Sequence, residues 1–155
     1  VAIAPDSGRA YLSKYFDDGW LRRLGFTDEP GSGADLDVVD LPVLRASWTV
    51  ARAREVLAAV PGPVPVSRDR DAGAAAPSEI LGALAARDLE GLPDGDAVVT
   101  HAGPVAPSVG TGEGIEAARA IVGDAEAAWV VHDGRVTGLL TRAALGLPES
   151  LAPAD

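Results

Sequence analysis

The chain has 155 residues and a formal net charge of −10; 47% of the residues are hydrophobic and 23% are charged. A chain of this length can bury roughly 70% of its extended-chain surface, whereas its negative charge disfavours nucleic acid and anionic membranes as partners. It has no cysteine, no apolar run of ~20 residues and no signal-peptide core in residues 1–5, so we expect no thiol chemistry, no membrane partner and a cytoplasmic location.

The first segment, residues 1–26, is apolar and rich in aromatic residues. Residues 1–4 predict a buried strand, residues 5–8 predict a tight turn, and the remainder predicts a helix that Gly25 is well placed to end. The helix carries apolar side chains at four-residue spacing: Leu12, Phe16, Trp20 and Leu24. A free-standing segment has little reason to be so apolar.

Residues 27–41 are acidic and contain Gly and Pro, which predicts a mobile linker. Residues 42–48 should then extend as a strand, and Thr49 should cap the N-terminus of the next helix. Trp48 lies beside that helix and is expected in the core.

The stretch from Val50 to Leu89 predicts a helix, a strand, an interruption, a second strand and a short helix. The predicted ranges are a helix over 50–60, strands over 64–67 and 78–84, and a short helix over 86–89. A long loop, residues 68–77, separates the two strands.

The stretch from Val105 to Leu147 predicts the same order of elements. The predicted ranges are a strand over 106–109, a helix from about Glu113, strands over 128–131 and 136–140, and a short helix over 142–145. Asp133-Gly134 is a residue pair that tolerates positive φ in a hairpin turn, and Trp129 should pack inward. Thr141 stands where the last strand gives way to the short helix, which is a place for an anion or a ribose.

The two stretches form an internal duplication. Their apolar helix positions match at an offset of 65, as in Val50 and Ile115 (115 minus 50). Gly82 and Gly138 match at an offset of 56 (138 minus 82), because the loop of the first copy is longer.

Two short motifs occur in this order. The first is hydrophobic-Pro-Val at Val64-Pro65-Val66, and the second is G-h-h-T-x-x-D, where h is hydrophobic. The second motif reads Gly82-Ala-Leu-Ala85-Ala-Arg-Asp88 in the first copy and Gly138-Leu-Leu-Thr141-Arg-Ala-Ala144 in the second. The repeated unit resembles the cystathionine-β-synthase (CBS) domain, two of which pack as a Bateman module.

The resemblance implies an α/β (α+β) fold made of tandem β-α-β-β-α units with pseudo-twofold symmetry. CBS domains would cover residues 42–92 and 93–148, followed by a tail over 149–155. Such a pair buries apolar helix faces by association, so the resemblance also implies a homodimer.

Many CBS pairs bind AMP, ATP or S-adenosylmethionine, so the resemblance implies an adenosine-containing ligand. In the family, the motif's Thr or Ser hydroxyl contacts phosphate or ribose, and its Asp accepts hydrogen bonds from both ribose hydroxyls. Here the first copy keeps Asp88 beside Ala85, and the second keeps Thr141 beside Ala144, so each pocket is half equipped. The implied ligand residues are Asp88, Thr141, Gly82, Gly138 and, as walls for adenine, Val64, Val66 and Ile80.

Residues 5–20 are similar to the last stretch of the catalytic domain in cystathionine β-synthase and related pyridoxal-phosphate (PLP) enzymes of fold type II. In that family the motif's Ser, Ser7 here, hydrogen-bonds the pyridine nitrogen of the cofactor. The single Lys, Lys14, lies in Ser-Lys-Tyr on a predicted helix, outside the family's Schiff-base context. Gly31-Ser-Gly33 has no strand before it and no helix after it, so it is not a phosphate loop. This chain is therefore expected to hold no cofactor and to be no enzyme by itself.

Three functions remain open at this point. The first is a regulatory module that senses an adenosyl ligand, the second is part of a PLP enzyme whose catalytic domain is separate, and the third is a structural dimerisation module. Asp88 and Thr141 also have a purely structural interpretation, as caps of short helices. His101 and His132 have no metal-ligand spacing, so we expect no metal site.

Overall fold

The computed structural model describes residues 18–26, 39–69 and 73–148. Its helices are α2 (Asp18–Arg23), α3 (Val50–Leu57) and α4 (Ile115–Val122), and its 3-10 helices are η2 (Pro77–Glu79), η3 (Ala86–Leu89) and η4 (Val98–His101). Its strands are β1 (Val39–Asp40), β2 (Leu44–Arg45), β3 (Val64–Ser67), β4 (Ile80–Leu84), β5 (Ser108–Gly110), β6 (Ala127–His132) and β7 (Arg135–Thr141). In this part of the chain, no helix has the length and apolarity to cross a membrane.

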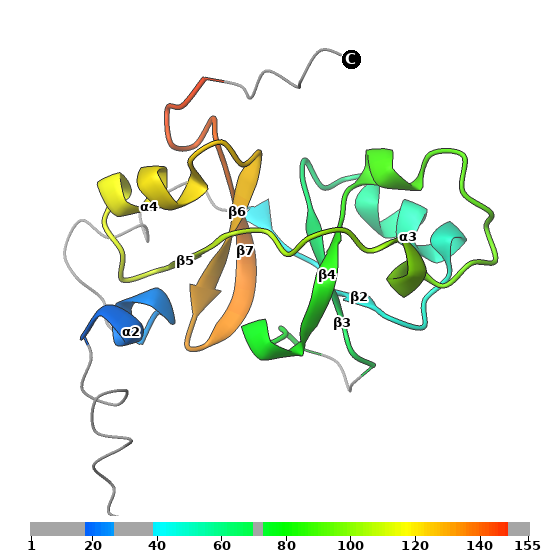
Figure 1. Ribbon diagram of the computed structural model, residues 1–155, viewed down its shortest axis with the longest axis horizontal. Coiled ribbons are helices and arrows are strands. Elements are labelled where there is room, and N and C mark those ends of the chain that lie inside the picture. The colour runs from blue at the N-terminus through cyan, green and yellow to red at the C-terminus, as the bar shows by residue number, and fades with distance from the viewer. Residues whose placement is uncertain (1–17, 27–38, 70–72, 149–155) are drawn as a thin grey trace, which may run out of the picture.

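The strands form two sheets that lie between the helices. One sheet has the order β2-β3-β4 and the other has the order β1-β7-β6-β5. Figure 1 shows the sheets in the middle of the molecule, with α3 on the outer side of one and α4 on the outer side of the other. The first copy therefore supplies one sheet and its helix, and the second copy supplies most of the other.

The strand pairing repeats between the copies. β2 pairs parallel with β3, which pairs antiparallel with β4; in the same way, β5 pairs parallel with β6 and β6 antiparallel with β7. A register shift follows Val66 in one sheet and Val130 in the other, at an offset of 64 (130 minus 66). The predicted duplication is thus reproduced down to the position of the bulge.

Each sheet is completed by the segment that leads into the other copy. Val39 of β1 pairs with Leu139 in the second sheet, although β1 precedes the first copy. Gly103 precedes the second copy and forms an antiparallel bridge with Ala83 of β4, with N–H···O distances of 3.1 and 2.8 Å. Val39 and Gly103 are equivalent (103 minus 39 is 64), so the two copies exchange edge segments reciprocally.

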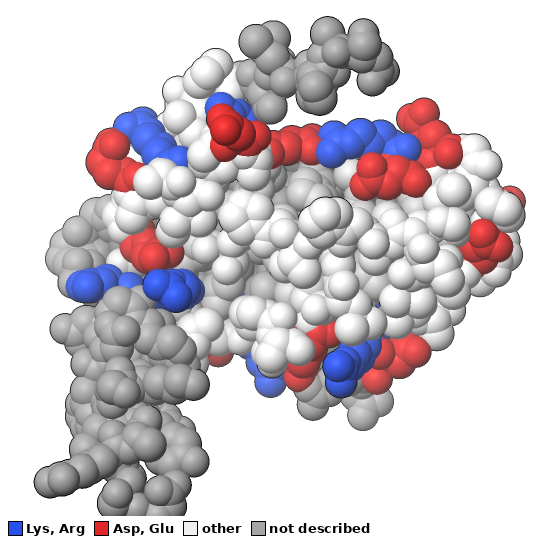
Figure 2. All heavy atoms as spheres, viewed as in Figure 1, with Lys and Arg blue, Asp and Glu red and all other residues white. Residues whose placement is uncertain are grey.

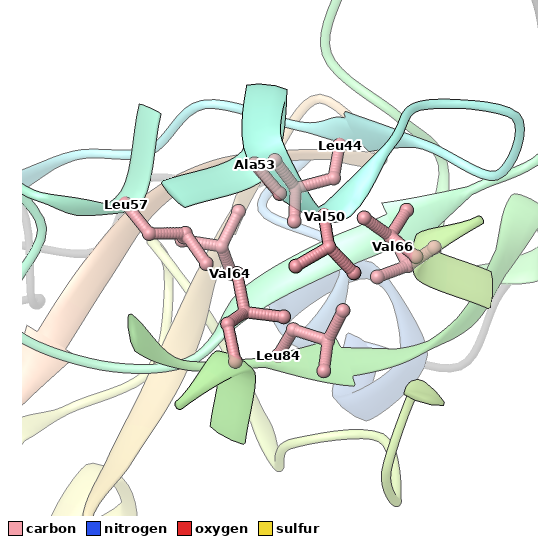
Figure 3. Packing of buried hydrophobic residues seen from close by; sticks show 9 residues of the cluster. Leu44, Val50, Ala53, Leu57, Val64, Val66 and Leu84 are labelled. Atoms are coloured by element: carbon pink, nitrogen blue, oxygen red, sulfur yellow. The ribbon is translucent and has the colours of Figure 1, made fainter. Parts of the chain in front are cut away.

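Helix α3 forms because its apolar positions fall on one face and its first turn is capped. Thr49 is extended, and its Oγ1 accepts a hydrogen bond from the Arg52 N–H at 3.4 Å, which confirms it as the N-cap. The buried face packs on β3 and β4, and Figure 3 shows its side chains pointing toward one another. The fully buried members of this cluster are Leu44, Val50, Ala53, Leu57, Val64, Val66, Leu84, Leu89 and Val98. Trp48 is only partly buried, with the Arg52 guanidinium 4.3 Å above its ring.

Besides the clusters under α3 and α4, a hydrophobic cluster fills the space between the two sheets. Alternate residues of β6 divide between two cores: Ala128 and Val130 face α4, whereas Trp129 and Val131 face the other sheet. Trp129 is 1% exposed, which confirms the prediction that it packs inward. Its indole N–H donates a hydrogen bond to the Pro63 carbonyl of the first copy at 2.8 Å. This hydrogen bond joins the two copies through the middle of the molecule.

Two further segments contact the second copy: the long loop of the first copy and residues 18–26. The long loop of the first copy reaches β7, where the Val136 N–H donates to the Ala75 carbonyl at 2.8 Å. Segment 18–26 packs on the second copy: Leu24 joins the central cluster, and its carbonyl accepts the Gly134 N–H at 2.8 Å. Gly134 and its neighbour Asp133 both have positive φ, +70° and +46°, which confirms the predicted hairpin turn.

Three expectations need correction. Val39 and Asp40, assigned to the linker, form β1, because β7 offers them a paired edge and Val39 contacts the central cluster. The predicted strand over 42–48 shortens to Leu44–Arg45, after which the chain turns toward Thr49. Residues 142–145 form a hydrogen-bonded turn and no helix, since Gly146 has φ +65° and reverses the chain there. The predicted strand over 1–4, Ser7, Lys14 and most of the linker lie outside the described residues.

Candidate ligand-binding site

The candidate site is built from two equivalent turns. The first motif turn, residues 85–89, follows β4, and the second motif turn, residues 141–145, follows β7. In a capping box, two residues three positions apart exchange hydrogen bonds. The side chain of the first accepts the backbone N–H of the second, and the side chain of the second accepts the backbone N–H of the first. Each motif turn keeps one half of this exchange.

Asp88 supplies the half that remains in the first motif turn. Its Oδ2 accepts the backbone N–H of Ala85 at 2.8 Å. The reverse bond is absent because alanine has no side-chain acceptor. Asp88 Oδ1 accepts no hydrogen bond from the described residues, and the Asp88 side chain is 45% exposed. A carboxylate can therefore cap this turn with one oxygen and present the other to a ligand hydroxyl.

Thr141 supplies the opposite half in the second motif turn. Its Oγ1 accepts the backbone N–H of Ala144 at 3.3 Å, as a capping hydroxyl does. Ala144 stands where the first motif turn has Asp88 (144 minus 88 is 56), so this turn has no carboxylate to offer. Of the two motif turns, only the first can offer a carboxylate oxygen to a ribose hydroxyl.

The motif glycines lie where the two copies exchange edges. A Cβ on Gly82 would lie 2.5 Å from the Gly103 carbonyl oxygen, so a larger residue would displace the exchanged segment. Gly138 is buried and pairs with Asp40 of β1, which is the equivalent place in the other sheet. Both glycines directly follow the residue that the bulge adds, Leu81 or Thr137. At Gly82 the missing Cβ allows the exchanged segment to approach β4 closely.

The three residues expected to form walls around adenine, Val64, Val66 and Ile80, differ in how deeply they are buried. Val64 and Val66 are fully buried under α3, so neither presents surface to a ligand in this structure. Ile80 is partly buried and packs on the central cluster between the sheets. The structure places Gly82 on β4 and Asp88 in the turn that follows it, whereas the side chains of the two valines are enclosed in the cluster under α3.

Two arginines missed in the sequence hold the motif turns in place. Arg54 of α3 donates through Nη2 to the carbonyls of Leu89 and Leu92 at 2.8 and 2.6 Å, and it forms an ion pair with Asp94. Arg119 of α4 donates through Nε to the Leu145 carbonyl at 3.0 Å. The offset of 65 between the helices makes the two arginines equivalent (119 minus 54), so the duplication itself carried the signal that could have identified them.

Loop 123–126, before β6, is held by both motif turns. From the first turn, the Arg87 guanidinium binds the Glu126 carboxylate through two hydrogen bonds, Nη1 to Oε1 at 2.8 Å and Nη2 to Oε2 at 2.5 Å. From the second turn, Arg142 Nη1 donates to the carbonyls of Gly123 and Ala125 at 2.5 and 3.1 Å. The hydrogen bonds with Glu126 raise the pKa of Arg87 above its ordinary value, so it stays charged.

The two histidines form local contacts. His101 Nε2 lies 3.0 Å from Asp96 Oδ2, and His132 Nδ1 lies 3.1 Å from Thr111 Oγ1. Within the ranges that the structure describes, no group of three or more His, Asp or Glu side chains could hold a metal ion. In the view of Figure 2, charged side chains of both signs gather along the edges of this face and leave its middle mostly uncharged.

No protein-family model matches the sequence. Several solved structures share the fold. The cytosolic domain of the Mg2+ channel MgtE in complex with ATP has a TM-score of 0.58 and 19% identity, over 76% of this chain and 48% of that one. The CBS pair domain of the putative Mg2+ transporter SO5017 from Shewanella oneidensis MR-1 has a TM-score of 0.55 and 19% identity, over 92% and 85% of the two chains. CBSX2 in complex with AMP has a TM-score of 0.55 and 20% identity, over 76% and 94%.

These likenesses establish the fold of a CBS-domain pair, as the repeated motifs predicted. The chain spans about half the length of the MgtE domain it matches. Two of the three similar proteins were solved with an adenine nucleotide bound.

Proposed function

We propose that the chain is a regulatory CBS pair that binds an adenosine-containing ligand at the first motif turn. The observation that carries this proposal is the arrangement of Asp88: one carboxylate oxygen caps its own turn, while Oδ1 accepts no hydrogen bond from the described residues. An aspartate in this position can accept ribose hydroxyls without giving up the bond that shapes the turn. ATP and AMP complexes of proteins with the same fold support the ligand class.

The remaining parts of the proposal rest on the sequence resemblance. We place the chain at the C-terminal end of a cystathionine β-synthase-like protein, non-catalytic by itself, cytoplasmic and homodimeric. Ser7 would contact PLP only in a complete catalytic domain. S-adenosylmethionine, AMP and ATP are the candidate ligands, and Thr141, Gly82, Gly138 and Ile80 complete the proposed ligand surroundings. Val64 and Val66 would contribute only if their buried side chains became accessible.

A structural dimerisation module is the second candidate, and one observation favours it. Asp88 and Thr141 both make local capping bonds, which is what each would do in a turn that binds nothing.

Equilibrium titration of the full chain with S-adenosylmethionine, AMP and ATP separates the two candidates. The sensing function requires saturable binding of at least one of them, with thermal stabilisation that rises with ligand concentration. If none of the three binds at millimolar concentration while the chain remains dimeric, the structural function replaces the sensing one.

A further inference from the structure

The Arg87–Glu126 ion pair crosses from the first motif turn to the second copy. The guanidinium and carboxylate face each other in a fork, with two parallel hydrogen bonds of 2.8 and 2.5 Å. Arginine binds phosphate in this same bidentate geometry. Glu126 therefore occupies the face of Arg87 that a phosphate group would use.

The position of Arg87 suits a ligand held at Asp88. The two residues are neighbours, and Arg87 Nε lies 3.8 Å from Asp88 Oδ1, the oxygen proposed for the ribose. The 5′-phosphate of a nucleotide lies one sugar ring away from the ribose hydroxyls, a span that the side chain of the adjoining arginine covers. An adenosine-type ligand at this turn would bring its phosphate to the Arg87 fork.

The ion pair is open to exchange with an incoming anion. The side chains of Arg87 and Glu126 are 62% and 40% exposed, so neither is locked in place by burial. Exposed ion pairs contribute little to stability, and an anion with more charge can replace the carboxylate. With Glu126 in place, however, a phosphate meets two carboxylates, Asp88 and Glu126, around a single guanidinium.

We propose that Arg87 selects phosphorylated ligands at the first motif turn and that Glu126 is the internal anion it must exchange for the phosphate. The inference rests on the proposed function and deepens it, because it assigns the charge specificity of that site. Adenosine without phosphate gains nothing from Arg87, whereas AMP and ATP bind in competition with Glu126.

The test compares adenosine and AMP on the full chain by isothermal titration, using the natural protein and three variants. Glu126→Gln frees the guanidinium, Arg87→Gln removes it, and Asp124→Asn is the matched control. Asp124 is an exposed carboxylate in the same loop with no hydrogen bond or ion pair in the described structure, so its variant changes the net charge equally. We expect Glu126→Gln to bind AMP about two- to fivefold more tightly with adenosine unchanged, the range that an exposed ion pair allows.

Arg87→Gln should weaken AMP binding about tenfold, toward the affinity for adenosine. If both ligands bind but their affinity ratio is the same in Glu126→Gln as in the natural protein, or if Asp124→Asn gives the same gain, the selection by Arg87 is overturned and the sensing function stands.

If neither ligand binds any variant at millimolar concentration, the sensing function falls, and a second measurement decides the role of Arg87. Thermal unfolding with inorganic tripolyphosphate at constant ionic strength should then stabilise Glu126→Gln more than Asp124→Asn. Equal stabilisation of these two variants would overturn the anion exchange as well.

Discussion

Replacement of Asp88 separates its capping role from its ligand role. Asp88→Ala removes the 2.8 Å hydrogen bond to the Ala85 N–H and the only carboxylate of the two motif turns. The loss of a cap costs about 1 kcal/mol, which lowers Tm by about 2–4 °C in a chain of this size. The loss of a charged acceptor for ribose should weaken nucleotide binding about 10- to 100-fold.

Glu79 offers a matched control for the stability lost when the capping hydrogen bond is removed. Its carboxylate accepts the Ala76 N–H at 3.0 Å, the same bond one 3-10 helix earlier in the chain. Glu79→Ala should therefore lower Tm at least as much as Asp88→Ala but leave ligand affinity unchanged. Asp88→Asn keeps an oxygen for the cap, so it should retain most of the stability and still bind ligand less tightly.

The assay combines differential scanning calorimetry with titration of the ligand that binds best. A variant series in which Asp88→Ala lowers Tm but keeps an affinity within twofold of the natural protein would refute the ribose role and leave Asp88 as a cap alone.

Two further predictions concern how the copies and the first segment are held. Trp129→Phe removes the indole N–H that donates to the Pro63 carbonyl, and it makes a fully buried side chain smaller. The free energy of unfolding, measured in urea, should therefore fall by about 2–4 kcal/mol. Trp48→Phe, the same exchange at a partly buried site, should cost clearly less, and equal losses would contradict the central role of Trp129. Gly110→Ala places a Cβ 1.8 Å from the backbone of α2, so trypsin should cleave residues 18–26 faster while the core stays folded. Gly95→Ala, with nothing within 4 Å, is its control, and similar cleavage rates would show that α2 does not depend on this contact.

Local patterns accounted for much of the fold. The alternation in β6 predicted that Trp129 faces inward, and the pair Asp133-Gly134 predicted a hairpin, because these choices depend on a few neighbouring residues. The pairing of Val39 with Leu139 was not predictable in this way, since it joins residues 100 apart (139 minus 39) and involves a strand of only two residues.

Candidate site residues could be named from the sequence where the repeat is regular, and others were missed where it is not. Ala85 and Ala144 stood out as departures from one shared motif, and the residues kept beside them, Asp88 and Thr141, make opposite halves of one capping exchange. The equivalence of Arg54 and Arg119 was visible in the sequence, but its purpose depends on carbonyl groups that no pattern shows. Glu126 has no counterpart, because Gly62 stands in its place in the first copy (126 minus 62 is 64), so nothing in the duplication pointed to its contact with Arg87.

The reciprocal exchange of edge segments ties the two copies into one unit. Cutting the chain between the copies would expose an open sheet border on each fragment, and such borders invite aggregation. Pulling the two copies apart would expose the same borders. The interlocked pair is therefore expected to fold and unfold as one unit.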